Sequence, residues 1–171
     1  MPNSTVQQKA QARSKPKQSN SFHRHDHRRC IQRGVEHATE HCDEAGLQLT
    51  PIRQRVLEIL LTEHRALGAY EILDQLRTDG FNSQPPVAYR ALDFLVQHGF
   101  VHKVERLNAF IACNTPETQH APTFLICRVC SAVAETHPEL CRGALGRSAR
   151  DAGFIIEQAV VEVEGLCPNC H

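Results

Sequence analysis

Apolar residues recur with a helical period along the first half of the chain. In the clearest stretch Thr50 caps the start of a helix, Pro51 opens its first turn, and one face carries Ile52, Val56, Ile59 and Leu60. Three further stretches share this period and stop at a glycine, at about 35–46, 69–80 and 85–99. Two β-prone runs, 100–104 and 110–113, then surround a turn at Asn108. This order of elements predicts a winged helix-turn-helix domain.

The pattern changes after residue 122, where short β-prone runs replace the helical period. The runs cover 123–127, 132–135 and 154–163, with one helical stretch at about 138–152. Six apolar residues supply most of the bulk of this unit: Phe124, Leu125, Ile126, Phe154, Ile155 and Ile156. So small an α+β unit usually needs a metal ion or a partner subunit to complete its core. We therefore predict an α+β chain with a winged-helix domain at 35–113, a hinge at 114–122 and a small second domain at 123–171.

The first part of the chain has a different composition. Residues 1–29 carry seven Lys or Arg side chains and one Asp, a net charge of +6, which the remainder cancels because the whole chain is neutral. Since this segment is polar and has few large apolar residues, we predict a disordered basic tail over residues 1–34. A neutral chain has no bulk positive field, so composition alone does not indicate a nucleic-acid partner.

The composition also limits the cellular setting and the chemistry. The apolar runs are short and the N-terminal stretch is polar and basic, so the sequence predicts neither a membrane span nor a secretory signal. We therefore expect a cytoplasmic protein, whose 8 Cys residues bind metals or react rather than form structural disulfides. The sequence has no phosphate loop, paired-acid cleft or nucleophile elbow. We expect neither an enzyme nor a small-molecule substrate.

Two C-x-x-C units enclose the second domain, Cys127-Arg-Val-Cys130 and Cys167-Pro-Asn-Cys170. Two thiolates at this spacing in a tight turn face one Zn²⁺, and two such turns complete a tetrahedral sulfur site. A shared ion would close the domain on itself, so we predict a structural zinc held by these four cysteines. Redox-active or incidental cysteine pairs are one alternative, and c-type haem attachment at Cys167-Pro-Asn-Cys170-His171, which needs export, is another. The sequence leaves open the roles of Cys30, Cys42 and Cys141.

Four segments of the first half resemble the ferric uptake regulator family: Leu49-Thr-Pro-x-Arg53, Tyr70-Glu-Ile-Leu-Asp-x-Leu76, Pro85-Pro-Val-Ala-Tyr-Arg-Ala-Leu-Asp-Phe-Leu95 and Gly99-Phe-Val-His-Lys-Val-Glu105. The resemblance continues through both C-x-x-C units and covers about residues 35–171. Within the family, Arg-Ala-Leu-Asp-Phe-Leu and Phe-Val-His-Lys-Val-Glu resemble the zinc uptake regulator branch. The single His120, where many members carry a His-rich cluster, agrees with that branch. The resemblance implies a homodimeric repressor that binds double-stranded operator DNA and dimerises through the second domain.

The resemblance also implies a regulatory zinc site, held by His102, Cys113, His120 and Glu135. Two imidazoles, one thiolate and one carboxylate form a set of ligands that suits tetrahedral Zn²⁺. These residues lie in the wing, at its exit, in the hinge and in the second domain, so they converge in only one arrangement of the domains. We expect two zinc ions per monomer, with the regulatory ion locking the dimer in a DNA-binding pose on palindromic operators of zinc-uptake genes.

The helix that begins at Pro85 carries the expected DNA contacts, Tyr89 and Arg90. Early turns of this helix enter the major groove in a helix-turn-helix, where an arginine bonds guanine bidentately. Asp74 and Arg77 match residues that link neighbouring dimers on DNA in relatives, although an exposed intrahelical pair is the simpler interpretation. Two other functions stay open, a sensor of iron or peroxide from the same family and a C-x-x-C thiol oxidoreductase or metal-transfer protein.

Overall fold

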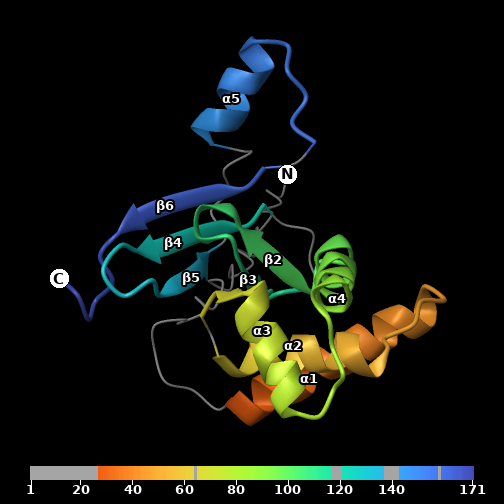
Figure 1. Cartoon of the computed structure of the whole chain (residues 1–171). Coiled ribbons are helices and arrows are strands. Elements are labelled where there is room, and N and C mark those ends of the chain that lie inside the picture. Colours follow the sequence, from red (N-terminus) through yellow and green to blue (C-terminus); the bar gives the residue numbers. More distant parts are fainter. Residues whose placement is uncertain (1–26, 64, 117–120, 137–142, 158) are drawn as a thin grey trace, which may run out of the picture.

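The computed structural model describes residues 27–63, 65–116, 121–136, 143–157 and 159–171. Figure 1 shows helices and a small sheet in one part of the molecule and a second sheet in the other. The predicted tail lies outside the described residues up to residue 26. Its predicted boundary at residue 34 is wrong, because helix α1 spans His27–Glu44.

Helix α1 begins early because its apolar stripe continues into the basic segment. The stripe faces the core and consists of Ile31, Val35, Ala38 and Cys42. Arg28, Arg29 and Arg33 are exposed, so the charges that indicated disorder lie on the solvent side. One apolar residue in each turn suffices to hold this part of the helix against its neighbours.

Three more helices complete this part: α2 (Pro51–Glu63), α3 (Ala69–Thr78) and α4 (Pro85–Gln97). They agree with the predicted helices to within about two residues at each end, the usual uncertainty of helix boundaries. Thr50 caps α2 as predicted, because its hydroxyl oxygen accepts a hydrogen bond from the Arg53 N–H at 3.4 Å. Gly99 ends the predicted α4 stretch in a left-handed conformation, with φ of 75°. In the ranges that the structure describes, no helix combines the length and apolarity needed to cross a bilayer.

The first sheet forms the wing and has the strand order β1-β3-β2, with antiparallel pairing throughout. Its strands are β1 (Leu67–Gly68), β2 (Val101–Val104) and β3 (Ala109–Ala112). A short 3₁₀ turn, η1 (Glu105–Leu107), and Asn108 in the left-handed conformation join β2 to β3. The hairpin matches the prediction, whereas β1 was not predicted because two residues are too short to show an alternating pattern.

The second sheet has the order β5-β4-β6. Strand β4 (Thr123–Cys127) pairs antiparallel with β5 (Val133–Thr136) and parallel with β6 (Val161–Gly165). Helix α5 (Ala144–Asp151) stands off this sheet on the side away from α1–α4 (Figure 1). The predicted helix 138–152 is therefore shorter in the described residues, and residues 137–142 lie outside them.

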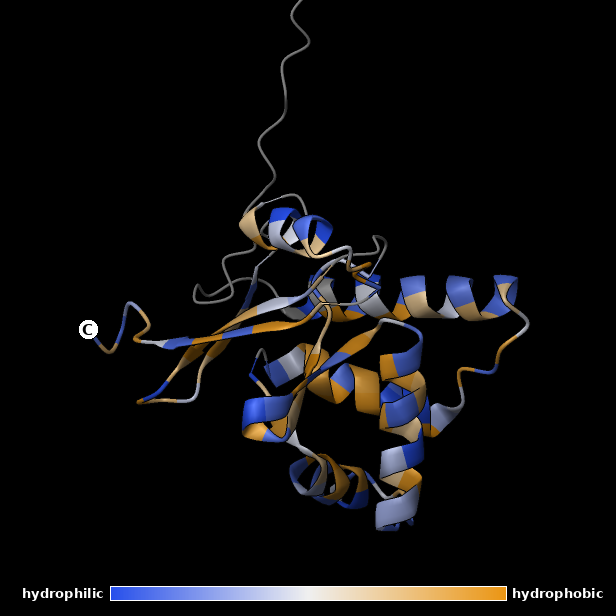
Figure 2. Ribbon diagram, turned by 90° about the horizontal axis from the view of Figure 1, so that it is seen from above, coloured by the Kyte–Doolittle hydropathy of each residue, from blue (hydrophilic) through white to orange (hydrophobic). Residues whose placement is uncertain are grey.

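The apolar residues of the second sheet face two ways. Phe124 and Ile126 are buried, as predicted. Phe154 and Ile155 are 67% and 83% exposed, so their prediction as core residues is wrong for the single chain. The cause is that the predicted strand 154–163 pairs with β4 only from Val161 onward. Figure 2 shows both orange, apolar segments and blue, polar segments on the strands of this sheet, which lead toward the C-terminus.

The wing packs on the inner face of the second sheet. Val104 and Ile111 of the wing form a buried cluster with Phe124, Ile126 and Val133 of the sheet. Both residues of the wing and all three of the sheet are at most 5% exposed. This cluster brings the ends of β2 and β3 next to β5 and places the candidate metal ligands.

Candidate metal centres

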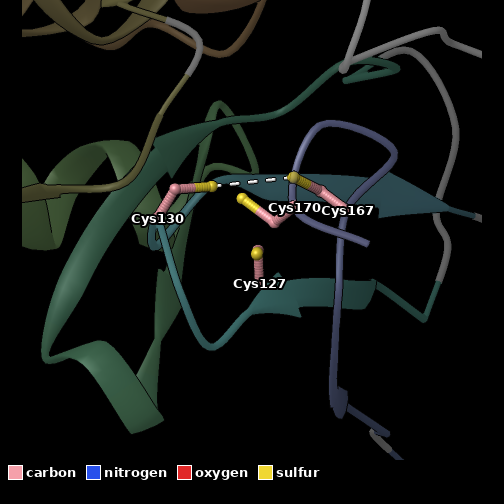
Figure 3. A group of neighbouring side chains, drawn as sticks. All are labelled: Cys127, Cys130, Cys167 and Cys170. Atoms are coloured by element: carbon pink, nitrogen blue, oxygen red, sulfur yellow. Dashed lines mark hydrogen bonds between the residues drawn. The ribbon is translucent and has the colours of Figure 1, made fainter.

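Four cysteines meet at the edge of the second sheet where β4 and β6 end (Figure 3). The parallel pairing of these strands places Cys127 opposite Gly165, so both C-x-x-C turns leave the sheet at the same edge. All four Sγ atoms lie within 4.8 Å of one another, and those of Cys130 and Cys167 are 3.6 Å apart. Thiolates about 2.3 Å from one zinc ion stand about 3.8 Å apart in a tetrahedron, so this spacing fits zinc.

The turns around the sulfur cluster favour the thiolate form of Cys127. The backbone N–H groups of Cys130, Cys167 and Val129 point at its sulfur and lower its pKa to about 6. Hydrogen bonding to the Cys167 and Cys130 side chains instead raises the pKa of Cys170 to about 12. The four sulfur atoms thus share a charge that a divalent cation would bind. These residues fit a structural zinc through both their spacing and their chemistry.

A second group of potential ligands lies between the wing and the second sheet. His102 comes from β2, Cys113 directly follows β3, and Glu135 belongs to β5. Their ligand atoms all lie within 4.8 Å of one another. The imidazole Nε2 of His102 is 3.2 Å from Oε1 of Glu135. His120, the fourth predicted ligand, lies outside the described residues.

Glu135 is a buried acid at the meeting point of the two parts of the molecule. It is only 2% exposed, and its second carboxylate oxygen accepts a hydrogen bond from the Asn114 N–H at 2.9 Å. Burial and the Glu135 carboxylate together raise the pKa of the Cys113 thiol to about 12. A buried carboxylate is costly unless a cation or hydrogen bonds compensate it. The combination of imidazole, thiol and buried carboxylate fits zinc.

Asn114 contacts the second candidate metal centre, and the sequence did not indicate this contact. Its contribution is a backbone N–H, which every residue except proline possesses, so no pattern in the sequence could identify it. Its position one residue after Cys113 orients Glu135 from the same segment that supplies the thiol.

The expected DNA contacts lie on the surface of α4. Tyr89 is 41% exposed, and Arg90 is exposed with its Nε donating to the carbonyl of Pro86 at 3.1 Å. On α3, Asp74 and Arg77 form the intrahelical pair that is the simpler interpretation, 3.4 Å apart and largely exposed. An exposed pair contributes little to stability, and Nε of Arg77 also donates to the carbonyl of Ser83 at 3.4 Å.

Cys42 and His171 are potential metal ligands that lie outside the two groups described above. Cys42 is 1% exposed in the helical core. Cys141 lies outside the described residues. The ring nitrogen Nδ1 of His171 lies 3.0 Å from the carbonyl oxygen of Cys167, at the rim of the sulfur cluster.

A family model and a curated protein that resemble this chain point to the same family. The family model described as the ferric uptake regulator family matches residues 44–164. The zinc uptake regulation protein of Escherichia coli (strain K12) is 38% identical over 130 residues, which are 75% of this chain and 76% of the relative.

Solved structures give the same result. A zinc uptake regulator complexed with zinc and DNA superposes with a TM-score of 0.76 at 36% identity, over 81% of this chain and 93% of the other. The crystal structure of holo XcZur gives a TM-score of 0.70 at 41% identity, over 79% of this chain and 94% of the other. The family model and these relatives cover most of the chain, and the chain therefore belongs to the ferric uptake regulator family.

Proposed function

We propose that this protein is a zinc-responsive transcriptional repressor that binds palindromic operators of zinc-uptake genes. The observation that carries the proposal is the second metal centre, whose ligands come from the wing and from the second sheet. The similarity to a zinc uptake regulator complexed with zinc and DNA supports the choice of metal and of partner. His102, Cys113, Glu135 and, from the hinge, His120 are the proposed regulatory ligands.

The proposed response depends on where these ligands lie. His102 and Cys113 belong to the DNA-binding part, whereas Glu135 belongs to the second sheet. They converge only when the wing rests on that sheet, so a shared ion favours this arrangement over all others. Bound zinc supplies a positive charge that compensates the buried carboxylate and the thiolate. A coupling of roughly 1–3 kcal/mol per site changes operator affinity about 5- to 150-fold.

The exposed apolar residues of the second sheet and of the segment between α5 and β6 support a homodimer. Leu125, Phe154, Ile155 and Val163 are between 40% and 83% exposed, which is unusual for a surface that meets only water. A second copy of the chain would cover them. The dimer then sets two α4 helices about one DNA turn apart, roughly 34–36 Å, as a palindromic operator requires.

The roles of the DNA-facing residues follow from this arrangement. We infer that Arg90 reads a base and that Tyr89 contacts a base or a phosphate, because both are exposed on α4. Asp74 and Arg77 are proposed to link neighbouring dimers on longer operators. The sulfur cluster of Cys127, Cys130, Cys167 and Cys170 is proposed to hold a second, structural zinc, so that each chain binds two ions. We expect a cytoplasmic protein without catalytic activity.

The decisive experiment is a zinc titration of operator binding, read against the zinc bound per chain. We expect two ions per chain, with DNA affinity following only the weaker one. A parallel titration with iron(II) distinguishes the zinc sensor from an iron sensor of the same family. If operator binding follows iron(II) or peroxide instead, or if zinc leaves it unchanged, the proposal is wrong. Freely titratable thiols in the zinc-loaded chain would favour a thiol oxidoreductase.

A further inference from the structure

The wing contacts the second sheet through η1, in addition to the second metal centre. The carboxylate of Glu162 on β6 accepts hydrogen bonds from the backbone N–H of Glu105 at 2.6 Å and of Arg106 at 3.0 Å. The guanidinium of Arg106 donates from Nε to Oε2 of Glu164 at 2.8 Å, and its Nη2 contacts the same oxygen. Figure 1 shows the loop between β2 and β3 lying against the strands of the second sheet. We call these contacts of Glu162 and Glu164 the η1 clasp.

The clasp belongs to the same face of the sheet as the metal centre. Phe124 on the central strand β4 pairs with Glu135 on β5 and with Glu162 on β6. Directly paired residues of neighbouring strands project from the same face, so these three side chains form one row across the sheet. Each of them meets the wing: the His102 imidazole lies 3.2 Å from Glu135, and its ring centroid lies 5.7 Å from that of Phe124.

The two carboxylates of the clasp make contacts of different strength with the wing. Glu162 is half-buried and satisfies two backbone N–H groups at the start of η1, which have no partner within that turn. Hydrogen bonds that involve an ionised acceptor are stronger than neutral ones. The Arg106–Glu164 pair is more exposed, at 54% and 39%, and such pairs contribute little. Of the two carboxylates of the clasp, Glu162 therefore contributes most to its strength.

We propose that Glu162 is a positioning residue of the zinc response: it fixes the wing on the second sheet without a metal ion and so preorganises His102 and Cys113 opposite Glu135. The inference rests on the proposed function, because the response that it tunes is zinc-dependent operator binding. Glu162 contacts the backbone of Glu105, three residues after His102 along the same strand and turn. Loss of the clasp frees the tip of the wing, so the arrangement in which His102 and Cys113 face Glu135 is less populated before zinc binds. The apparent zinc affinity then falls.

The first test measures the attachment itself by amide hydrogen exchange of the full chain with its first zinc ion bound. We expect slow exchange of the Glu105 and Arg106 amides in the wild type. Glu162→Gln keeps the shape of the side chain but turns an NH₂ group toward one of these donors and leaves only a neutral acceptor for the other, so both amides should exchange at least tenfold faster. Glu157→Gln removes an exposed charge from the segment before β6 and serves as the matched control.

The second test measures the zinc response of the same variants by operator binding. For Glu162→Gln we expect the zinc concentration at half-maximal binding to rise about tenfold, the factor that corresponds to one lost charge-assisted hydrogen bond. Arg106→Gln should raise this zinc concentration less than threefold, because the Arg106–Glu164 pair that the substitution removes is exposed. Glu157→Gln should match the wild type. Retention of one zinc per chain by every variant shows that the second sheet remains folded.

The outcomes separate this inference from the proposed function. A wild type that ignores zinc contradicts the proposed function, and the amide exchange then still decides whether Glu162 attaches the wing. Unchanged amide exchange in Glu162→Gln overturns the inference. Faster exchange combined with a wild-type zinc response also overturns it, because the clasp would then hold the wing without positioning the ligands.

Discussion

Glu135 and Glu162 stand on either side of Phe124 in one cross-strand row on the inner face of the second sheet. The wing gives the two carboxylates different partners. Glu135 meets an imidazole and a thiol and is buried, whereas Glu162 meets two backbone N–H groups and remains half-exposed. One row of side chains therefore carries both the acid of the candidate regulatory centre and a carboxylate of the clasp.

Removing a regulatory ligand should uncouple operator binding from zinc. His102→Ala and Cys113→Ser are each expected to fold, to dimerise and to retain one zinc ion per chain, because the sulfur cluster is intact. Their operator affinity should no longer increase when zinc is added, a loss of about 5- to 150-fold at saturating zinc. Fluorescence anisotropy with labelled operator measures this, and His37→Ala, which removes an imidazole from α1, is the control. Unchanged repression in the variants would refute the assignment of these ligands.

Removing one sulfur ligand should have a different effect. Cys127→Ser is expected to unfold or monomerise the chain even with excess zinc, because binding of a structural zinc contributes on the order of 10 kcal/mol to folding. Zinc content and thermal unfolding measure the effect. Cys42→Ala removes a buried thiol from the helical core and should retain the ion. A Cys127→Ser chain that melts like the wild type would exclude a structural role for the cluster.

The regulatory centre should release a proton when it binds zinc. Because burial and Glu135 raise the pKa of Cys113 to about 12, its thiol is protonated near neutral pH and must lose the proton to become a ligand. Zinc affinity should therefore rise with pH between about 6.5 and 8.5, by about tenfold per pH unit for this one proton. Calorimetric titration in buffers of different ionisation enthalpy counts the protons. Binding without proton release would show that Cys113 is not a ligand.

The base-reading role of Arg90 predicts a loss of specificity rather than of affinity alone. Arg90→Ala should reduce the preference for operator over random DNA by about 1–3 kcal/mol, the energy of one bidentate contact with guanine. Competition titrations with both kinds of DNA measure this preference. If both affinities fall by the same factor, Arg90 contacts a phosphate instead.

If the exposed apolar residues around Ile155 form the dimer interface, a charge introduced at this position should prevent dimerisation. Ile155 is 83% exposed in the single chain, so Ile155→Glu should leave the monomer folded and shift it away from the dimer. Sedimentation gives the oligomeric state, and operator affinity should fall in parallel because one monomer spans only one half-site. A variant that remains dimeric would place the interface elsewhere.

The helical part of the fold could be predicted closely, because its apolar period and its caps are local properties of the sequence. Phe154 and Ile155 could not be placed, since their apolar character indicates burial but not whether the same chain provides it. The candidate ligands His102, Cys113 and Glu135 could be predicted only from a family resemblance, because three residues from three elements form no pattern along the chain. Glu162 was not identified at all, because it lies 57 residues from the amide that it binds.

The sulfur cluster and the clasp are joined by one strand. Cys167 follows β6 after a single residue, and the N–H of Arg128 donates to the carbonyl of Gly165 at 3.0 Å, so the cluster fastens the end of this strand to β4. Glu162 and Glu164 lie on the strand that is fastened in this way. On the proposed function, the two ions would therefore bind in order: without an ion in the sulfur cluster this end of β6 would be less firmly held, and the wing would lack a fixed surface on which to bring His102 and Cys113 to Glu135.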